Sequence, residues 1–201
     1  MIPHFNFPAI FVIINPIVSE NRKVVAIVGM AGSGKSEVAR IFEQHGFTRI
    51  RFGDITDEEV KKRGLALNED NERRIRELLR KEHGMAAYAI LNLPQIDAAL
   101  KKSNVVLDGL YSWEEYTLLK DHYGDDLSVV AVWASPKTRY NRLSNRAVRP
   151  LTHKEASSRD RTEIENTNKG GPIAMADDTI TNESSLSDLE AQANKLLAGW
   201  K

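Results

Sequence analysis

The stretch Gly29-Met30-Ala31-Gly32-Ser33-Gly34-Lys35-Ser36 decides the fold of this chain. It fits the pattern G-x-x-x-x-G-K-[ST], in which successive backbone N–H groups surround an anion. An apolar run at 24–28 precedes it and is typical of a buried strand, and apolar residues at helical spacing follow at 37–43. A strand, a glycine-rich loop and a helix in this order place the anion at the positive end of the helix. We therefore expect this loop to bind a nucleoside triphosphate.

Two side chains of the loop are expected to do chemistry. The Lys35 ammonium is predicted to contact the β- and γ-phosphates, and the Ser36 hydroxyl is predicted to bind Mg²⁺. Residues 29–36 are expected to bind the nucleotide, with the backbone amides of 30–36 around the phosphates. A chance glycine-rich turn is disfavoured because the strand and the helix are both in register with the loop. The expected cofactors are ATP and Mg²⁺.

The composition limits the remaining possibilities. The chain has 201 residues, which is enough for one domain with a single large core. Its 28 basic and 28 acidic side chains give no net field toward nucleic acid or an anionic membrane. The absence of cysteine from the sequence excludes disulfides, thiolate metal sites and cysteine nucleophiles, and fits a reducing cytoplasm.

The first 22 residues are expected to lie outside the domain. Their apolar part, 5–18, is interrupted by asparagine and proline and is too short for a membrane span, which needs about 20 apolar residues. It also lacks a basic start and a cleavage site typical of a signal peptide. We interpret 1–22 as an extension or the product of an upstream start, with an added edge strand as the alternative. The domain then covers 23–201.

Strand-like and helical segments alternate along the domain, which predicts an α/β fold with a parallel sheet. Polar stretches at 54–82 and 144–171 indicate two movable lobes beside the core. Besides the strand at 24–28, strands are expected at 47–51, 104–108, 128–133 and 179–181. Besides the helix after the loop, helices are expected at 55–63, 69–81, 84–100, 112–122, 136–145 and 185–197.

An acidic residue, Asp108, ends the third strand. The carboxyl ends of parallel strands face the ligand in open α/β sheets, so Asp108 is predicted to hold Mg²⁺ directly or through water. An ordinary Asp-Gly turn is the alternative. The next residue is Gly109, whereas proteins that use ATP hydrolysis to do work usually have a glutamate there. This argues against hydrolysis as the purpose of the site.

Arginines follow the fourth strand. Arg139, Arg142 and Arg146 are spaced by three and four residues, which predicts one helix face, and Arg149 comes after them. Because 136–151 contains no acidic residue, we expect at least two of these arginines to neutralise charge during phosphoryl transfer. The pair Asn168-Lys169 is followed by glycine rather than aspartate, so a guanine-binding motif is not indicated.

The chain resembles the nucleoside-monophosphate-kinase group of P-loop proteins. It is most similar to the dephospho-CoA-kinase-like and adenylate-kinase-related members. The resemblance rests on GMAGSGKS (29–36), FGD (52–54), VVLDG (105–109), ASPKTRYNRLSNR (134–146) and MADDTITNESSLSDL (175–189). It implies a three-layer αβα sandwich whose five parallel strands have the order 2-3-1-4-5. It also implies an acceptor lobe at 54–100 and an arginine-bearing lid at 144–171.

The resemblance also implies roles for single residues. Asp54 matches the acid that takes or positions the proton of an acceptor hydroxyl, although its position equally suits a helix N-cap. Arg142 and Arg146 match lid arginines that contact the transferred phosphoryl group and the adenine face. Asn182 matches the loop beside adenine. Monophosphate kinases usually carry an arginine where this chain has Leu110-Tyr111, so the acceptor is not identified.

These observations predict an ATP-dependent phosphotransferase that acts on a nucleotide or nucleotide-like small molecule. The alternatives are dephospho-CoA kinase proper and a non-catalytic ATP-binding regulator or assembly factor; a nucleic-acid 5′-end kinase is weaker because no basic stripe is present. We expect a cytoplasmic monomer or weak dimer, whose partners are ATP and a small-molecule acceptor, without nucleic acid or membrane.

Overall fold

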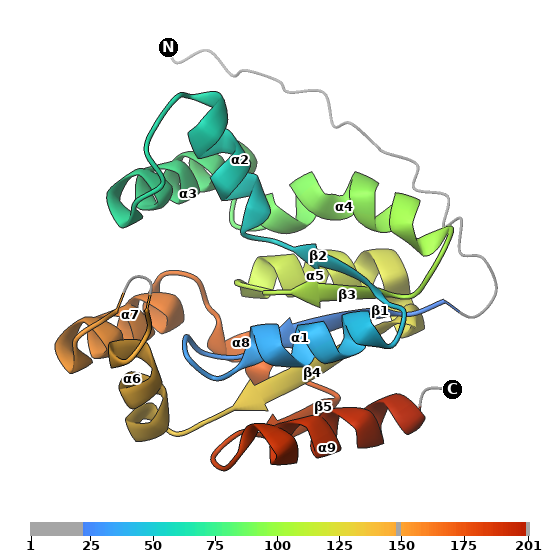
Figure 1. Ribbon diagram of the computed structural model, residues 1–201. Helices are drawn as coiled ribbons and strands as arrows, with labels where there is room; N and C mark the ends of the chain where they lie inside the picture. Colours follow the sequence, from blue (N-terminus) through green and yellow to red (C-terminus); the bar gives the residue numbers. More distant parts are fainter. Residues whose placement is uncertain (1–21, 148–149, 200–201) are drawn as a thin grey trace.

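Five parallel strands form the central sheet of the computed structural model, which describes residues 22–147 and 150–199 (Figure 1). The strands are β1 (Val24–Val28), β2 (Thr48–Arg51), β3 (Val105–Asp108), β4 (Leu127–Trp133) and β5 (Asp178–Thr181), in the order β2-β3-β1-β4-β5. Asp108, the last residue of β3, pairs with Ile27 of β1 and with Arg51 of β2. The expected 2-3-1-4-5 order is confirmed, and it brings the ends of these three strands to one edge.

Both faces of the sheet are apolar and covered by helices. Val25 and Ile27 of β1 belong to a core with α1 (Lys35–Gln44) and α9 (Leu186–Ala198). Alternate β1 residues belong to a second core with α4 (Ala87–Leu100) and α5 (Trp113–Tyr123). Two buried faces are typical of a parallel sheet, and Figure 1 shows the resulting three layers. The three-layer α/β fold is that of P-loop proteins.

Two pairs of helices extend beyond the carboxyl edge of the sheet (Figure 1). On one side lie α2 (Asp54–Lys62) and α3 (Glu69–His83), and on the other α6 (Pro136–Ser144) and α7 (His153–Glu165). The short α8 (Gly170–Ala174) packs against α5 and β4. A 3₁₀ turn, η1 (Gly124–Asp126), precedes β4. Within the expected acceptor lobe, 54–100, α4 packs on the sheet, so α2 and α3 form its outer part. Most of the expected extension, 1–21, lies outside the described residues.

One local expectation is wrong, and one helix was not predicted. Asp54 is not a helix N-cap, since Gly53 occupies that position and no side chain caps α2. The segment 153–165 is the helix α7, which its polar sequence did not predict. A capping box starts this helix, because the Glu155 backbone N–H donates to the Thr152 hydroxyl at 3.3 Å and the Glu155 carboxylate accepts the Thr152 N–H at 2.7 Å.

Nowhere in 22–147 or 150–199 does a helix combine the length and apolar character that crossing a bilayer would require.

Candidate active site

The glycine-rich loop connects β1 to α1 in a conformation that only glycine allows at several points. Gly29 and Gly34 have φ angles of 145° and 103°. A Cβ atom on Gly29 would lie 2.3 Å from the Val132 carbonyl oxygen, and one on Gly34 would lie 2.3 Å from Asn182 Nδ2. The loop is therefore held tightly between β4 and the segment after β5. The backbone amides at the start of α1 follow it, at the position where the sequence predicts that an anion binds.

Lys35 folds back over the loop. Its ammonium donates to the Met30 carbonyl at 2.9 Å. Burial, and after it the positive charge of Lys169, lowers the pKa of Lys35 to about 7. An anion bound beside Lys35 would favour the ammonium form, so we expect Lys35 to take up a proton when the anion binds.

Ser36 and Asp108 meet where the sequence analysis placed a metal. The Ser36 hydroxyl donates to Asp108 Oδ1 at 3.2 Å, and Arg49 forms an ion pair with Asp108 Oδ2. Within the described segments, no group of three or more histidine or acidic side chains is arranged around a metal position. Mg²⁺ needs no such group, because it keeps several waters and takes phosphate oxygens beside one or two protein ligands. The oxygen donors of Ser36 and Asp108 fit that requirement.

Arg139 was expected to neutralise phosphate charge, but its side chain is buried in an ion pair. It is 4% exposed, and its guanidinium binds both oxygens of Asp160 at 2.8 and 2.6 Å. The same side chain donates to the Ala31 carbonyl of the loop at 3.1 Å, and Tyr140 Oη donates to Asp160 at 3.0 Å. Arg139 therefore joins α6, α7 and the loop. The expectation that no acid neutralises this arginine is wrong, since the partner comes from α7.

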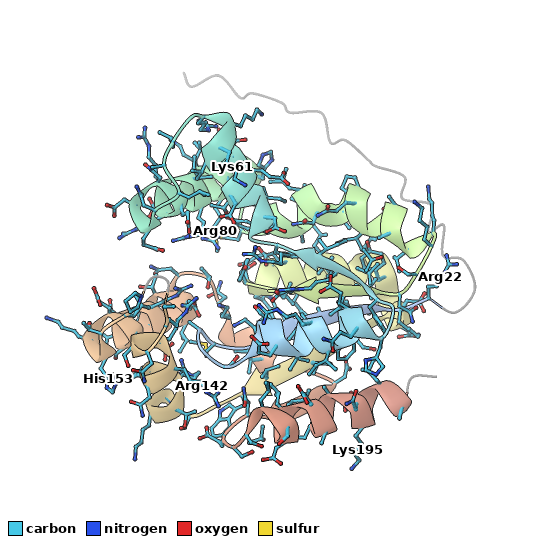
Figure 2. All side chains as sticks on the ribbon, in the orientation of Figure 1. Arg22, Lys61, Arg80, Arg142, His153 and Lys195 are labelled. Carbon is cyan, nitrogen blue, oxygen red and sulfur yellow. The ribbon has the colours of Figure 1, made fainter. Side chains whose placement is uncertain are left out.

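Arg142 contacts the loop through one intermediary. Its Nη2 donates to Asn182 Oδ1 at 3.2 Å, and Asn182 Nδ2 donates to the Ser33 carbonyl at 2.8 Å. Arg142 Nη1 is buried and finds no hydrogen-bond partner among the described residues. In Figure 2 the side chain lies between α6 and the loop–α1 junction. A buried guanidinium nitrogen without an acceptor fits an anionic ligand at this position.

Arg146 lies beyond the helix. Because α6 ends at Ser144, Arg146 does not share a helix face with Arg139, contrary to the spacing argument. Arg146 nevertheless lines the same cavity as Arg142. Arg149 lies outside the described residues.

The site has a buried charged group that the sequence did not reveal. Lys169 is 3% exposed and donates to Glu163 at 2.8 Å, and Arg159 donates to the other oxygen of Glu163 at 3.1 Å. Although burial acts to raise it, the charges of Lys169 and Arg159 lower the pKa of Glu163 to about 2. Asn168, with φ 51°, makes the left-handed turn before Lys169. Lys169 also lies 5.3 Å from the centre of the Tyr111 ring.

Asp54 is held at the edge of this arrangement. Its carboxylate forms an ion pair with Arg51 at 2.8 Å, and about half of its side chain is exposed. Arg51 lines the cavity, whereas Asp54 does not. The position of Asp54 therefore suits orientation of Arg51.

One cavity of about 630 Å³ brings these groups together. Its wall is formed by residues from the loop, the ends of β2 and β3, α6, α7 and the segment after β5. Its charged lining residues are Lys35, Glu37, Arg51, Asp108, Arg142, Arg146, Arg159, Glu163 and Lys169. Of the predicted site residues, Ala31, Gly32, Gly34, Lys35, Ser36, Asp108, Arg142, Arg146 and Asn182 line it. The other predicted site residues, Gly29, Met30, Ser33 and Asp54, are not among the lining residues.

Comparison with known proteins agrees with this geometry. A family model described as an AAA domain matches residues 25–164. A UPF0200 protein of Thermococcus kodakarensis is 37% identical over 178 residues, which cover 87% of this chain and 96% of that protein. A UPF0200 protein of Hyperthermus butylicus is 37% identical over 180 residues, covering 89% and 95%.

Two solved structures share the fold at low sequence identity. TT1252 from Thermus thermophilus has a TM-score of 0.62 at 21% identity, covering 90% of this chain and all of that one. A gluconokinase from Sinorhizobium meliloti has a TM-score of 0.53 at 16% identity, covering 89% and 95%. These likenesses agree with the three-layer α/β fold of P-loop proteins. The chain belongs to the UPF0200 family and carries an AAA domain.

Proposed function

We propose that this protein is an ATP-dependent phosphotransferase, which transfers the γ-phosphoryl group of Mg-ATP to a small-molecule acceptor. The observation that carries the proposal is the cavity itself. The loop lysine lines this cavity together with cationic side chains from β2, α6 and α7, which supports the proposal. In phosphoryl transfer the protein forms few covalent bonds itself and acts mainly by neutralising negative charge. Several cationic side chains around one cavity can provide this neutralisation.

The residues have distinct roles in this proposal. Lys35 and the backbone amides of 30–36 bind the phosphates, and Arg142 and Arg146 bind the transferred group from the lid side. Asn182 holds Arg142 against the loop and lies beside the nucleotide. Ser36 and Asp108 would hold Mg²⁺, which neutralises phosphate charge when it is bound.

Two features favour transfer to an acceptor over hydrolysis. The residue after Asp108 is Gly109, with φ 104°, and it offers no carboxylate to orient a water. Helix α7 is joined to the loop through Arg139, which binds both Asp160 and the Ala31 carbonyl, and its residues Arg159 and Glu163 line the cavity. Closure of the acceptor lobe over this fixed side would exclude water from the reacting groups.

Dephospho-CoA kinase proper is a narrower form of the proposal, in which Asp54 acts on a ribose hydroxyl. The ion pair of Asp54 with Arg51 gives that role less support. We also propose that the protein works in the cytoplasm, where ATP is available, as a monomer or weak dimer.

A thermal-shift experiment tests the proposal. A ligand at 100 times its Kd stabilises the native state by about 2.7 kcal/mol, which raises the Tm of a domain of this size by about 5–11 °C. We expect this shift with a non-hydrolysable ATP analogue and Mg²⁺, and a larger one when the acceptor is added. Lys35→Ala should abolish the nucleotide shift, and Lys195→Ala on α9, which points away from the cavity (Figure 2), should retain it. A nucleotide shift that no acceptor enlarges would favour the regulator instead.

A further inference from the structure

Arg49 is a charged residue of β2 on the face of the sheet that α1 covers. In the pairing of β2 with β3, Arg49 lies beside Val106 and Arg51 lies beside Asp108. Side chains alternate between the two faces along a strand, so Val106 and Asp108 share one face. Val106 belongs to the core with α1, and Arg49 lies on the same face. Only 14% of the Arg49 side chain is exposed, so its charge needs a partner inside the protein.

That partner is Asp108, the carboxylate that we propose to hold Mg²⁺. Arg49 Nη2 forms an ion pair with Asp108 Oδ2, while Asp108 Oδ1 accepts the Ser36 hydroxyl at 3.2 Å. The Asp108 side chain is 5% exposed, and each of its oxygens thus has a donor. Arg49 also lies 3.6 Å from Glu43 of α1, whose side chain is 54% exposed. The buried contact of Arg49 is therefore the one with Asp108.

These contacts determine how the Ser36 hydroxyl can be used. A hydroxyl group has one hydrogen and two lone pairs. Because Ser36 donates its hydrogen to Asp108 Oδ1, its lone pairs are available to a cation. This donation requires Oδ1 to face Ser36, and the pairing of Oδ2 with Arg49 opposes rotation of the carboxylate. Through Asp108, Arg49 thus orients both oxygen donors of the proposed metal position.

The Arg49–Asp108 pair is a poor source of stability for the fold. The attraction within a buried ion pair is largely offset by the cost of removing both charges from water. Apolar side chains of similar volume often replace such a pair without loss of stability, and Val106 beside Arg49 is apolar. Groups that hydrogen-bond to a metal-binding carboxylate, in contrast, commonly set its orientation. The position of Arg49 therefore favours a role at the site.

We infer that Arg49 is a positioning residue for Mg²⁺, which orients Asp108 and, through it, the Ser36 hydroxyl toward the cation bound with the nucleotide. The inference rests on the proposed phosphotransferase function, which assigns Mg²⁺ to these two side chains. Partners of metal-binding side chains typically contribute about 10–100-fold to metal affinity. Arg49 itself does not line the cavity. Its loss should therefore weaken the binding of Mg²⁺ and leave the binding of the phosphates by the loop intact.

The test compares nucleotide binding with and without the metal. Calorimetry gives the Kd of a non-hydrolysable ATP analogue in EDTA and in excess Mg²⁺, and the ratio of the two values measures the tightening due to Mg²⁺. For Arg49→Gln we expect this ratio to be at least about 10-fold smaller than for the wild type, with the Kd in EDTA unchanged within about 2-fold. Glu43→Gln removes the exposed partner of Arg49 and, as the matched control, should keep the wild-type ratio.

Arg49→Lys keeps the test valid if Arg49→Gln fails to fold. Lysine retains the positive charge beside Asp108, but its ammonium is a point charge on a flexible stem and lacks the planar fork of arginine. It should therefore hold the carboxylate less firmly, and we expect the ratio to fall at least about 3-fold. A larger loss in Arg49→Gln than in Arg49→Lys would agree with partial rescue by the conservative variant.

The outcomes separate the inference from the proposed function. A loss smaller than about 3-fold in Arg49→Gln, or in Arg49→Lys where the glutamine variant does not fold, would overturn the inference. A ratio above that of the wild type would also overturn it, and so would equal weakening in EDTA and in Mg²⁺, which would indicate a purely structural role. These results leave the kinase proposal standing. If the wild type bound the analogue under neither condition, the proposed function itself would fail.

Discussion

Asp160→Asn should destabilise the protein far more than any exposed charge change on the same helix. Asp160 and Arg139 are 12% and 5% exposed at their side chains, and two hydrogen bonds of 2.6 and 2.8 Å join them. Removing the charge of Asp160 leaves a buried guanidinium without its counter-ion. Breaking a buried pair in this way costs about 3–5 kcal/mol. Since asparagine keeps one acceptor oxygen, we expect the lower end, about 3 kcal/mol.

The control is Glu165→Gln, also on α7. Glu165 pairs with Arg161 at 3.4 Å, with side chains 62% and 78% exposed. Such a pair contributes at most about 1 kcal/mol and often nothing measurable. Urea denaturation, with the midpoint converted through a common m-value, gives both free energies of unfolding.

The same substitution should weaken nucleotide binding. Arg139 donates to the Ala31 carbonyl at 3.1 Å, so a displaced guanidinium releases one point at which the loop is fixed. We expect the Kd for Mg-ATP to rise about 10-fold for Asp160→Asn, equivalent to roughly 1.4 kcal/mol. If Asp160→Asn and Glu165→Gln differed by less than about 0.5 kcal/mol in stability, the idea that this pair fixes the lid to the loop would be refuted.

Three other predictions concern single sites. The pKa of Lys35 is about 7 in the free protein, and bound phosphates should raise it. Nucleotide binding should therefore be accompanied by uptake of about 0.9 proton at pH 8 and about 0.1 proton at pH 6. Calorimetric titrations in buffers of different ionisation enthalpy measure this uptake, and zero uptake at pH 8 would contradict the prediction. Burial raises the pKa of Glu115 from 4.5 to about 7, so the native state binds a proton that the unfolded state releases. The free energy of unfolding should therefore fall by on the order of 3 kcal/mol as pH rises from about 4.5 to 7. Glu115→Gln should remove this contribution, and an unchanged slope of unfolding free energy against pH in that variant would count against the assignment. Gly34→Ala should reduce the affinity for ATP at least 10-fold, because its Cβ would lie 2.3 Å from Asn182 Nδ2. The control is Gly46→Ala, where φ is 90° and no atom lies within 4 Å, so that only backbone strain of about 1–2 kcal/mol in stability is expected. Equal ATP affinities for the two variants would contradict the contact.

Local pattern was enough to predict the strands and the meeting of Ser36 with Asp108. The strands β1, β3 and β4 are short apolar runs, and parallel strands end at one edge, so Asp108 could be expected near Ser36. The structure places the two side chains 3.2 Å apart. The strand order was not derivable from periodicity and came from the resemblance to P-loop kinases.

The lid side could not be predicted because its contacts join residues far apart in the chain. Asp160, which neutralises Arg139, comes from a helix whose polar sequence lacks an apolar stripe. The Thr152-x-x-Glu155 spacing, which is typical of a capping box, is a signal from which its start could have been found. In the sequence, Lys169 stands in an Asn-Lys pair before two glycines, and this pattern did not predict that it is buried at the site. Its burial depends on Glu163 and on Tyr111, and no local pattern connects these residues.

The most direct test of the phosphotransferase proposal is to follow the label of γ-³²P-ATP. The protein, Mg²⁺ and labelled ATP are incubated with nucleoside 5′-monophosphates, dephospho-CoA or gluconate, and the products are separated. The account predicts that label moves to an organic acceptor at least 10-fold faster than it appears as inorganic phosphate. It also predicts that Lys35→Ala lowers this transfer by about 10³-fold, the scale on which phosphoryl-transfer cations act. Label found only as inorganic phosphate, or transfer unchanged in Lys35→Ala, would contradict it.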